Sequence, residues 1–249
     1  MGKTGRVAEQ RLSGGAVNEV VLVDGTVRRR PAAGRAEFVH RLLAHFQQQD
    51  WPGAPRFLGH DEQGREMLSY LPGYVAWREP QPDWLRSAEC LAATARLLRQ
   101  CHDLTEGPAL AGEQEVVCHN DLAPKNTVYD DDRRPIAFID WDLAAPGARI
   151  HDVAHLCWQY LDLGPAIRDV ARAARNLRII CDAYGLDDRA TLLDTVYWWQ
   201  ERCWQGIDAA ADAGEPAMIA LRDAGTCDTV RAAADWLDTH RTALSAELG

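Results

Sequence analysis

Hydrophobic and polar positions follow different periods in the two parts of this chain. "NEVVLVDGTVRRRP" has two runs rich in β-branched residues on either side of an Asp-Gly pair, and this pattern predicts a β-hairpin. "AEFVHRLLAHFQQQ" repeats its apolar residues at the spacing of one helical face. "PRFLGHDEQGREMLSYLPG" supplies two further runs typical of strands. The first part of the chain is therefore predicted to be a small antiparallel sheet with one helix.

The pattern changes at Pro72-Gly73, which interrupts the strands and indicates a hinge. "DWLRSAECLAATARLLRQCHDL" predicts a long helix, and the pattern is helical almost throughout from His151 onward. We therefore predict an α+β fold of two lobes. Residues 1–72 are expected to form a small antiparallel β lobe, and residues 73–249 a larger, mainly helical lobe.

Charge and composition exclude several classes of protein. A formal net charge of −10 argues against a general nucleic-acid binder. No apolar run reaches the roughly 18 residues that a membrane-spanning helix needs, and the N-terminus lacks the apolar core of a signal peptide. The seven cysteines are odd in number and show no paired spacing, which indicates reduced thiols. We expect a cytoplasmic protein that binds neither nucleic acid nor membrane.

The stretch "VVCHNDLAPKNTVYDDDRRPIAFIDWD" carries the candidate chemistry. Asp121 and Asn126 precede a predicted hairpin, and Asp140 and Asp142 follow it. The loop fits the kinase signature H-x-D-x-x-x-x-N, and Ile-Asp-Trp stands in place of D-F-G. Phosphoryl transfer needs a divalent metal to neutralise the phosphates, so Asp140 and Asn126 are predicted to hold Mg²⁺ through oxygen ligands. Asp121 is predicted to accept the proton of the acceptor hydroxyl; the alternative is a surface hairpin with acidic turns.

"CHNDLAPKN…IDWDLAAPGARIHDVAH" resembles the aminoglycoside phosphotransferase and choline-kinase-like family, which has the protein-kinase-like fold. "LSGGAVNEVVLV" is similar to the family's nucleotide loop, and "MLSYLPG" is similar to its interlobe linker. The likeness extends over nearly the whole chain. It implies that residues 1–72 form a nucleotide-binding lobe and residues 73–249 a catalytic and acceptor-binding lobe.

The same resemblance implies roles for individual residues. Asp121 is the expected catalytic base, and Asn126 and Asp140 are the expected magnesium ligands. The nucleotide is expected to meet backbone atoms at five positions: Ser13, Gly14 and Gly15 at the phosphates, and Ser69 and Leu71 at the adenine.

Three further residues near the motif have implied or open roles. Asp152 is expected to anchor the catalytic loop by accepting from backbone N–H groups, and His119 to pack beneath that loop. Asp142 is either an assistant in the metal shell or an exposed carboxylate of the turn. "HDVAH" at 151–155 imitates the H-E-x-x-H pattern of zinc hydrolases, but we interpret it as the helix that carries Asp152.

The chain departs from the family at one important position. The family's third strand carries a lysine for the phosphates, and this chain has no lysine between Lys3 and Lys125. Strand alternation favours Arg29 as the inward-facing substitute, with Glu37 on the following helix as its partner. Arg28 is the competing candidate, and a solvated arginine cluster is the simpler explanation. The departure also raises a second hypothesis, a nucleotide-binding protein with weak or no transfer activity.

The acidic excess lies mainly in the last part of the chain. Residues 151–249 hold nine arginines, no lysine and sixteen acidic residues. Three acids recur every seven positions on one predicted helical stripe: Asp194, Glu201 and Asp208. This stripe is either a solvated face or a wall that binds amines. Three tryptophans nearby belong either to the core or to an acceptor pocket: Trp198, Trp199 and Trp204.

These observations predict a transferase that depends on Mg²⁺ and acts on small molecules. It would move the γ-phosphate of ATP or GTP to a hydroxyl of an aminoglycoside-like or other hydroxylated, cationic acceptor, as in antibiotic resistance. The alternative is a nucleotide-binding, pseudokinase-like regulatory or interaction module. A zinc hydrolase based on "HDVAH" is a distant third hypothesis.

Overall fold

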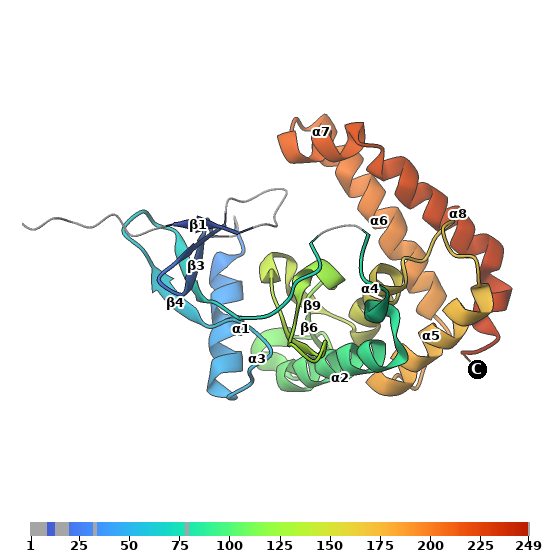
Figure 1. Ribbon diagram of the computed structural model, residues 1–249, viewed down its shortest axis with the longest axis horizontal. Helices are drawn as coiled ribbons and strands as arrows, with labels where there is room; N and C mark the ends of the chain where they lie inside the picture. The colour runs from blue at the N-terminus through green and yellow to red at the C-terminus, as the bar shows by residue number, and fades with distance from the viewer. Residues whose placement is uncertain (1–8, 13–19, 32–33, 78–79, 249) are drawn as a thin grey trace, which may run out of the picture.

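The computed structural model describes residues 9–12, 20–31, 34–77 and 80–248 of the 249-residue chain. A β-sheet and helix α1 lie at one end, and a larger helical part lies at the other (Figure 1). The predicted α+β fold of two lobes is confirmed. The predicted boundary between residues 72 and 73 stays a prediction. Within the described residues, none of the helices combines the length and the apolar character needed to cross a membrane.

The small lobe is a five-stranded antiparallel sheet with the strand order β1-β2-β3-β5-β4. Its strands are β1 (Gln10–Arg11), β2 (Val21–Val23), β3 (Thr26–Arg29), β4 (Phe57–His60) and β5 (Glu66–Ser69). The turn between β2 and β3 is formed by Asp24 and Gly25, whose φ angles of 48° and 73° are both positive. Asp and Gly accept this conformation in two-residue hairpins, so the predicted hairpin is confirmed.

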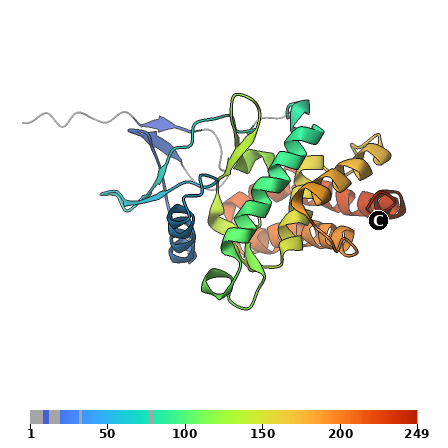
Figure 2. The same ribbon diagram turned by 90° about the horizontal axis from the view of Figure 1, so that it is seen from below.

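Helix α1 (Ala36–Gln48) follows β3 and precedes β4 in the chain. Figures 1 and 2 place it at the boundary between the sheet and the helical lobe. Phe46, on its buried face, has its ring centroid 4.7 Å from that of Trp51 and 5.2 Å from that of Trp141. Trp141 follows Asp140 directly, so α1 packs against the segment that carries the predicted metal ligand. The face contains four buried residues: Val39, Leu42, Leu43 and Phe46.

The large lobe contains seven helices among the described residues. They are α2 (Ala88–Thr105), α3 (Pro108–Ala111), α4 (Arg149–Leu161), α5 (Val170–Tyr184), α6 (Leu192–Asp212), α7 (Pro216–Asp223) and α8 (Thr226–Ser245). Helix α4 lies at the centre, where much of its surface is buried. The predicted long helix at 83–104 begins as a short 3₁₀ helix, η1 (Asp83–Arg86). Helix α2 starts afterwards, where the Ser87 side chain accepts a hydrogen bond from the Cys90 backbone N–H at 3.2 Å.

Two small antiparallel ribbons lie between α3 and α4. Strand β6 (Val116–Cys118) pairs with β9 (Ala145–Gly147), and β7 (Thr127–Tyr129) pairs with β8 (Pro135–Phe138). The 3₁₀ helices η2 (Pro124–Asn126) and η3 (Trp141–Leu143) flank the second ribbon. Gly73, at the predicted boundary, has a φ of 154°, and an added Cβ there would lie 2.5 Å from the Tyr129 carbonyl oxygen. A side chain at this position would therefore push the linker away from β7.

Candidate active site

The β7–β8 hairpin brings the predicted metal ligands together. Thr127 pairs with Phe138 in its register. One step further out, the Ile139 backbone N–H donates to the Asn126 carbonyl oxygen at 2.9 Å. Asp140 follows Ile139 and therefore lies beside Asn126 at the open end of the ribbon. The acidic groups on both sides of the hairpin thus converge because of its register.

The Asn126 side chain has a fixed orientation. Its Nδ2 donates to the backbone oxygen of Asp121 at 2.8 Å and to Asp121 Oδ2 at 2.7 Å. The carbonyl atom Oδ1 is buried and has no hydrogen-bond partner in the part of the chain that the structure describes. A buried polar atom without a partner costs about 1–3 kcal/mol. An oxygen in this state fits a metal ligand, and Mg²⁺ prefers oxygen ligands.

Asp140 has a left-handed backbone conformation, with φ 65° and ψ 64°. Such a conformation costs on the order of 1–3 kcal/mol outside glycine and persists where neighbours enforce it. His119 is one such neighbour, since its Nε2 lies 3.0 Å from the Ile139 carbonyl oxygen and its ring centroid lies 4.5 Å from that of the tilted Trp141 ring. The Asp140 side chain is 41% exposed, so its carboxylate can reach a bound ion.

Arg29 connects the sheet to the segment that carries Asp140, the predicted metal ligand. Its Nε donates to Glu66 at 2.6 Å, and its Nη1 donates to Asp140 at 3.1 Å. Nη1 and Nη2 also grip both oxygens of Asp142, which is the bidentate geometry that a guanidinium favours. Asp142 therefore has a definite place in the structure as the main carboxylate partner of Arg29.

The prediction that Glu37 is the partner of Arg29 is wrong, because the structure pairs Arg29 with Glu66. Glu37 is exposed on α1, whereas Glu66 is the cross-strand neighbour of Arg29 in the β3–β5 register. The carboxylate of Glu66 is buried and also lies 2.8 Å from His40 Nε2. Of the three consecutive arginines, Arg29 alone is buried. Arg28 forms a longer ion pair with Asp61, at 3.6 Å.

The charges around Arg29 do not balance. Burial opposes its charge, but the ion pairs with Asp142, Glu66 and Asp140 outweigh burial and raise the pKa of Arg29 above its ordinary value. One guanidinium still faces three carboxylates. The excess of negative charge is what a divalent cation compensates, so the donor set of Asn126 and Asp140 fits Mg²⁺ in both chemistry and charge.

Asp152 holds the start of the catalytic loop. Its two carboxylate oxygens accept from the backbone N–H groups of His119 at 2.6 Å and of Asn120 at 2.9 Å. The expected anchoring role is therefore confirmed. His119 is fully buried and packs beneath the loop, as expected.

Comparison with known proteins shows to which family the chain belongs. The model of the phosphotransferase enzyme family matches residues 20–192, which is well over half of the chain. The chain belongs to the phosphotransferase enzyme family. The resemblance found in the sequence motifs is thereby confirmed.

Relatives of known name agree with this membership. The trifolitoxin immunity protein of Rhizobium leguminosarum bv. trifolii is 29% identical over 266 residues, covering 95% of this chain and 97% of that protein. The macrolide 2'-phosphotransferase MphH from Brachybacterium faecium has a TM-score of 0.61 at 17% identity and covers 94% of this chain and 93% of its own. Aminoglycoside phosphotransferase APH(3'')-Id from Streptomyces rimosus, solved with ADP and streptomycin, has a TM-score of 0.59 at 17% identity and covers 79% and 91%. These likenesses confirm the fold.

The structure describes two of the five positions at which the nucleotide is predicted to meet the backbone, Ser69 and Leu71. Ser13, Gly14 and Gly15 lie outside the described residues. The Ser69 backbone N–H already donates to the Arg56 carbonyl oxygen at 2.9 Å, and Ser69 pairs with Thr26 across β3 and β5. Leu71 has no backbone hydrogen bond to another described residue, so both of its backbone groups are available. The adenine contacts stay predictions.

The acidic stripe on α6 is engaged with α8. Asp194 forms an ion pair with Arg241 at 2.5 Å, and Asp208 with Arg231 at 2.8 Å. The third member, Glu201, accepts from Trp204 Nε1 at 3.0 Å. The two ion pairs connect α6 to α8, whereas the Glu201 contact lies within α6. They favour a structural role for the stripe, in which it holds the two helices together.

The three tryptophans of α6 differ in their surroundings. Trp199 is buried and donates through Nε1 to the His151 carbonyl oxygen at 2.7 Å. Trp198 is exposed and stacks on the His151 ring at 5.3 Å between centroids. Trp204 lies under the Arg231 guanidinium at 4.2 Å. His151 and His155 have separate partners, since His155 Nδ1 lies 3.0 Å from the Leu122 carbonyl oxygen. The zinc-hydrolase interpretation of "HDVAH" therefore gains no support.

Two residues near Asp121 were missed by the sequence reasoning. Lys125 Nζ lies 3.8 Å from Asp121 Oδ2. Cys203 on α6 lies close enough for the charge of Asp121 to act on it, and burial followed by that charge raises the pKa of its thiol to about 11. Only the tertiary packing of α6 could bring Cys203 within range of that charge.

Proposed function

We propose that this protein is a Mg²⁺-dependent phosphotransferase that moves the γ-phosphate of ATP or GTP to a hydroxyl of a small molecule. The observation that carries the proposal is the buried Oδ1 of Asn126, which has no hydrogen-bond partner among the described residues and belongs to the side chain that contacts Asp121. A surface hairpin with acidic turns has no need of such an atom. A bound Mg²⁺ would neutralise phosphate charge, with Asn126 and Asp140 as its protein ligands.

Asp121 acts on the acceptor. Asn126 Nδ2 holds Asp121 Oδ2 at 2.7 Å, which leaves Oδ1 to accept the hydroxyl proton. The acceptor oxygen then forms its bond to the γ-phosphorus as the bond to the β,γ-bridging oxygen breaks. The proton stays on Asp121, and the nucleoside diphosphate leaves. Lys125 Nζ lies 3.8 Å from the same carboxylate.

Arg29 acts on the nucleotide side of the site. In this proposal it takes the place of the missing lysine and presents its charge toward the phosphates. Arginine is always charged and binds phosphate bidentately, but its planar group needs a fixed orientation. Glu66 and Asp142 supply that orientation from opposite sides of the guanidinium. Glu66 thus takes the role that the sequence pattern gave to Glu37.

We propose that the acceptor is a hydroxylated natural product with antibiotic or toxic activity. The full-length similarity to a trifolitoxin immunity protein supports this class, as do neighbours whose names specify macrolides and streptomycin. Cationic character of the acceptor rests on the acidic excess of residues 151–249. Since Asp194 and Asp208 already pair with arginines, the attraction would come from the whole lobe rather than from the α6 stripe.

A second candidate is a nucleotide-binding module without transfer activity. The absence of any lysine from the third strand favours it, together with the contact of Arg29 to Asp140, one of the predicted metal ligands. In this alternative Arg29 stays paired with Asp140 and Asp142 when nucleotide binds. No acceptor would then be phosphorylated.

One experiment separates the two candidates. The purified protein is incubated with ATP or GTP, with and without Mg²⁺, and with a panel of aminoglycosides, macrolides and hydroxylated amines. Nucleoside diphosphate release and the mass of each acceptor are measured. A Mg²⁺-dependent gain of one phosphate on an acceptor, lost in Asp121→Asn, is the expected result. Tight Mg²⁺–nucleotide binding with no phosphorylated product across the panel would favour the second candidate.

A further inference from the structure

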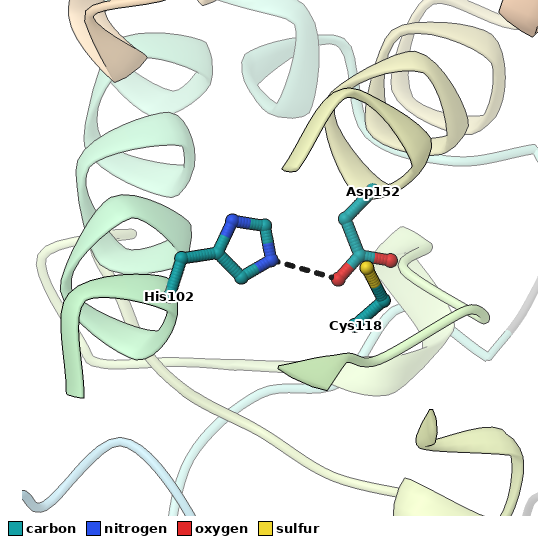
Figure 3. A group of neighbouring side chains, drawn as sticks. All are labelled: His102, Cys118 and Asp152. Carbon is teal, nitrogen blue, oxygen red and sulfur yellow. Dashed lines mark hydrogen bonds and ion pairs between the residues drawn. The ribbon is translucent and has the colours of Figure 1, made fainter. Parts of the chain in front are cut away.

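His102 on α2 reaches the catalytic loop through a single carboxylate. His102 and Asp152 are both completely buried, and His102 Nε2 lies 3.1 Å from Asp152 Oδ2. Figure 3 shows the imidazole pointing across from α2 to the carboxylate at the start of α4. The same Asp152 Oδ2 accepts the His119 backbone N–H at 2.6 Å. Only one side chain therefore separates His102 from the backbone of the loop that carries Asp121.

The group formed by His102, Cys118 and Asp152 has the composition of a metal site. Their possible ligand atoms lie within 4.8 Å of one another. However, the Cys118 thiol donates to the Ala148 carbonyl oxygen at 3.2 Å, and burial raises its pKa so that it stays protonated. Both oxygens of Asp152 accept backbone N–H groups of the catalytic loop. A metal would have to displace these bonds, so the group is a hydrogen-bonded network.

The network supports a strained piece of backbone. Asn120 has a φ of 63°, a left-handed conformation that costs energy outside glycine. Asn120 immediately precedes Asp121, so its backbone conformation sets the place of the predicted base. The Asn120 N–H donates to Asp152 Oδ1 at 2.9 Å, and such bonds are strongest when the acceptor is ionised.

His102 helps to keep that acceptor ionised. Burial alone opposes a charge on Asp152, yet the hydrogen bond and the charge of His102 lower the pKa of Asp152 below its ordinary value. The other ring nitrogen, Nδ1, lies 2.7 Å from the Tyr184 hydroxyl on α5. Tyr184 therefore fixes the rotation of the imidazole, and Nε2 is directed at Asp152. The chain of bonds runs from α5 through α2 and α4 to the catalytic loop.

We propose that His102 is a positioning residue that sets the location of Asp121 by orienting Asp152 against the backbone of Asn120, with Tyr184 holding His102 in place. This inference rests on the proposed phosphotransfer for its effect on rate. Its effect on the loop itself does not depend on transfer. The two can therefore be tested separately.

The test compares four variants: His102→Ala, His102→Gln, Tyr184→Phe and Leu98→Ala. Leu98 is a completely buried residue of the same helix, outside the network, and its variant controls for general destabilisation of α2. The kcat, the KM for nucleotide and acceptor, and the thermal unfolding midpoint are measured for each. His102→Ala should lower kcat by about 10²-fold with the nucleotide KM changed little, because misplacement of a catalytic group by about 1 Å has such an effect.

The other three variants are expected to lower kcat by smaller amounts than His102→Ala does. Gln at position 102 keeps an N–H donor for Asp152 and should lose no more than about tenfold in kcat, and Tyr184→Phe should lose less. Leu98→Ala should lower the unfolding midpoint and leave kcat close to wild type. Loss of stability on acidification should begin at higher pH in His102→Ala, since burial, which raises the pKa of Asp152, is then opposed only by His119 and the backbone N–H groups of the loop. Equal kcat in His102→Ala and Leu98→Ala would overturn the positioning role.

Backbone amide exchange at His119 and Asn120 provides a readout that needs no turnover. We expect faster exchange of these two amides in His102→Ala and Tyr184→Phe than in Leu98→Ala. Unchanged protection in both network variants would contradict the inference even if the enzyme is active. If the wild type phosphorylates no acceptor but the amides lose protection as expected, the proposed function fails and the positioning role stands.

Discussion

The carboxylates around Arg29 and the carboxylates along α6 differ in what neutralises them. Glu66, Asp140 and Asp142 share one guanidinium. On α6, Asp194 and Asp208 each have an arginine of α8 as an ion-pair partner. The first group keeps an excess of negative charge and lies beside the Asn126 side-chain oxygen, which is without a hydrogen-bond partner in the described parts of the chain. An unbalanced group with an orphaned ligand atom indicates a cation site better than the number of acids does.

Burial separates the two groups as well. The Arg29 and Glu66 side chains are 9% and 2% exposed, whereas Asp194 is 68% exposed. Exposed ion pairs contribute about 0–1 kcal/mol, because water already solvates both charges. Removing one partner of a buried pair costs about 3–5 kcal/mol, since the other charge stays buried without compensation. Changes at the first group should therefore have much larger effects than changes at the second.

The largest effect on turnover is expected at Asp121. Asp121→Ala should reduce transfer by about 10²–10⁴-fold, the usual contribution of a general base. Nucleotide affinity should stay close to wild type, because the base contacts the acceptor in the proposed mechanism. Steady-state kinetics together with nucleotide calorimetry give both quantities. Turnover near the wild-type rate would remove Asp121 from the mechanism.

Asp140 should control the dependence of nucleotide binding on Mg²⁺. Asp140→Ala removes the main charged ligand proposed for the ion, so ATP binding with Mg²⁺ should fall to the level seen without it. Calorimetry of ATP with and without Mg²⁺ measures the difference. Asp142→Asn is the matched comparison, since Asp142 contacts Arg29 and is not proposed as a ligand. The assignment is wrong if Asp140→Ala retains the full response to Mg²⁺ and Asp142→Asn loses it.

Arg29 tests whether a guanidinium replaces the family's lysine. Arg29→Ala should weaken ATP binding or turnover far more than Arg28→Ala or Arg30→Ala, because Arg29 is the buried member of the three. Arg29→Ala also leaves Glu66 buried with His40 as its remaining partner, so the free energy of unfolding should fall by about 3–5 kcal/mol. Thermal unfolding and ATP calorimetry of the three variants provide the comparison.

Arg29→Lys distinguishes charge from shape at the same position. Lysine keeps the charge but cannot grip Asp142 bidentately while reaching Glu66. If all three alanine variants bind ATP equally well, the arginines form only a basic surface. If Arg29→Lys matches or exceeds wild-type turnover, the charge alone is sufficient.

Local features of the fold could be predicted from the sequence, because each depends on a short run of residues. The Asp24-Gly25 hairpin follows from turn chemistry, and the buried face of α1 follows from periodicity. The convergence of Asn126 and Asp140 follows from a motif and one hairpin register. Each of these signals lies within about 25 residues of the chain.

Features that depend on contacts between residues far apart in the sequence could not be predicted correctly from the sequence. Glu66 faces Arg29 only because β5 lies next to β3, and the sequence alone offered Glu37 as the nearer acid. His102 stands near the end of an ordinary amphipathic helix, where nothing indicates that Asp152 lies across from it. Once the β3–β5 register is known, however, a buried opposite-charge pair directly across two strands is the expected arrangement.

The smallest effect is expected on the α6 stripe, in the variant that replaces Asp194, Glu201 and Asp208 by Asn, Gln and Asn. It loses two ion pairs with α8, each contributing about 0–1 kcal/mol, so thermal stability should fall only slightly. The acceptor KM should stay unchanged, because the two aspartates are already neutralised by arginines. Salt further screens any attraction that an exposed stripe exerts on a cation.

Cys203→Phe gives the contrasting measurement on the same helix. Cys203 lies close enough to Asp121 to be affected by its charge, so a larger side chain there should obstruct the acceptor and raise its KM while the nucleotide KM stays the same. Both variants are assayed with an acceptor confirmed by phosphate transfer. A raised acceptor KM in the stripe variant, with none in Cys203→Phe, would reverse the assignment and make the stripe the acceptor wall. An unchanged acceptor KM in both would place the acceptor away from α6 altogether, since neither face of the helix would then contact it.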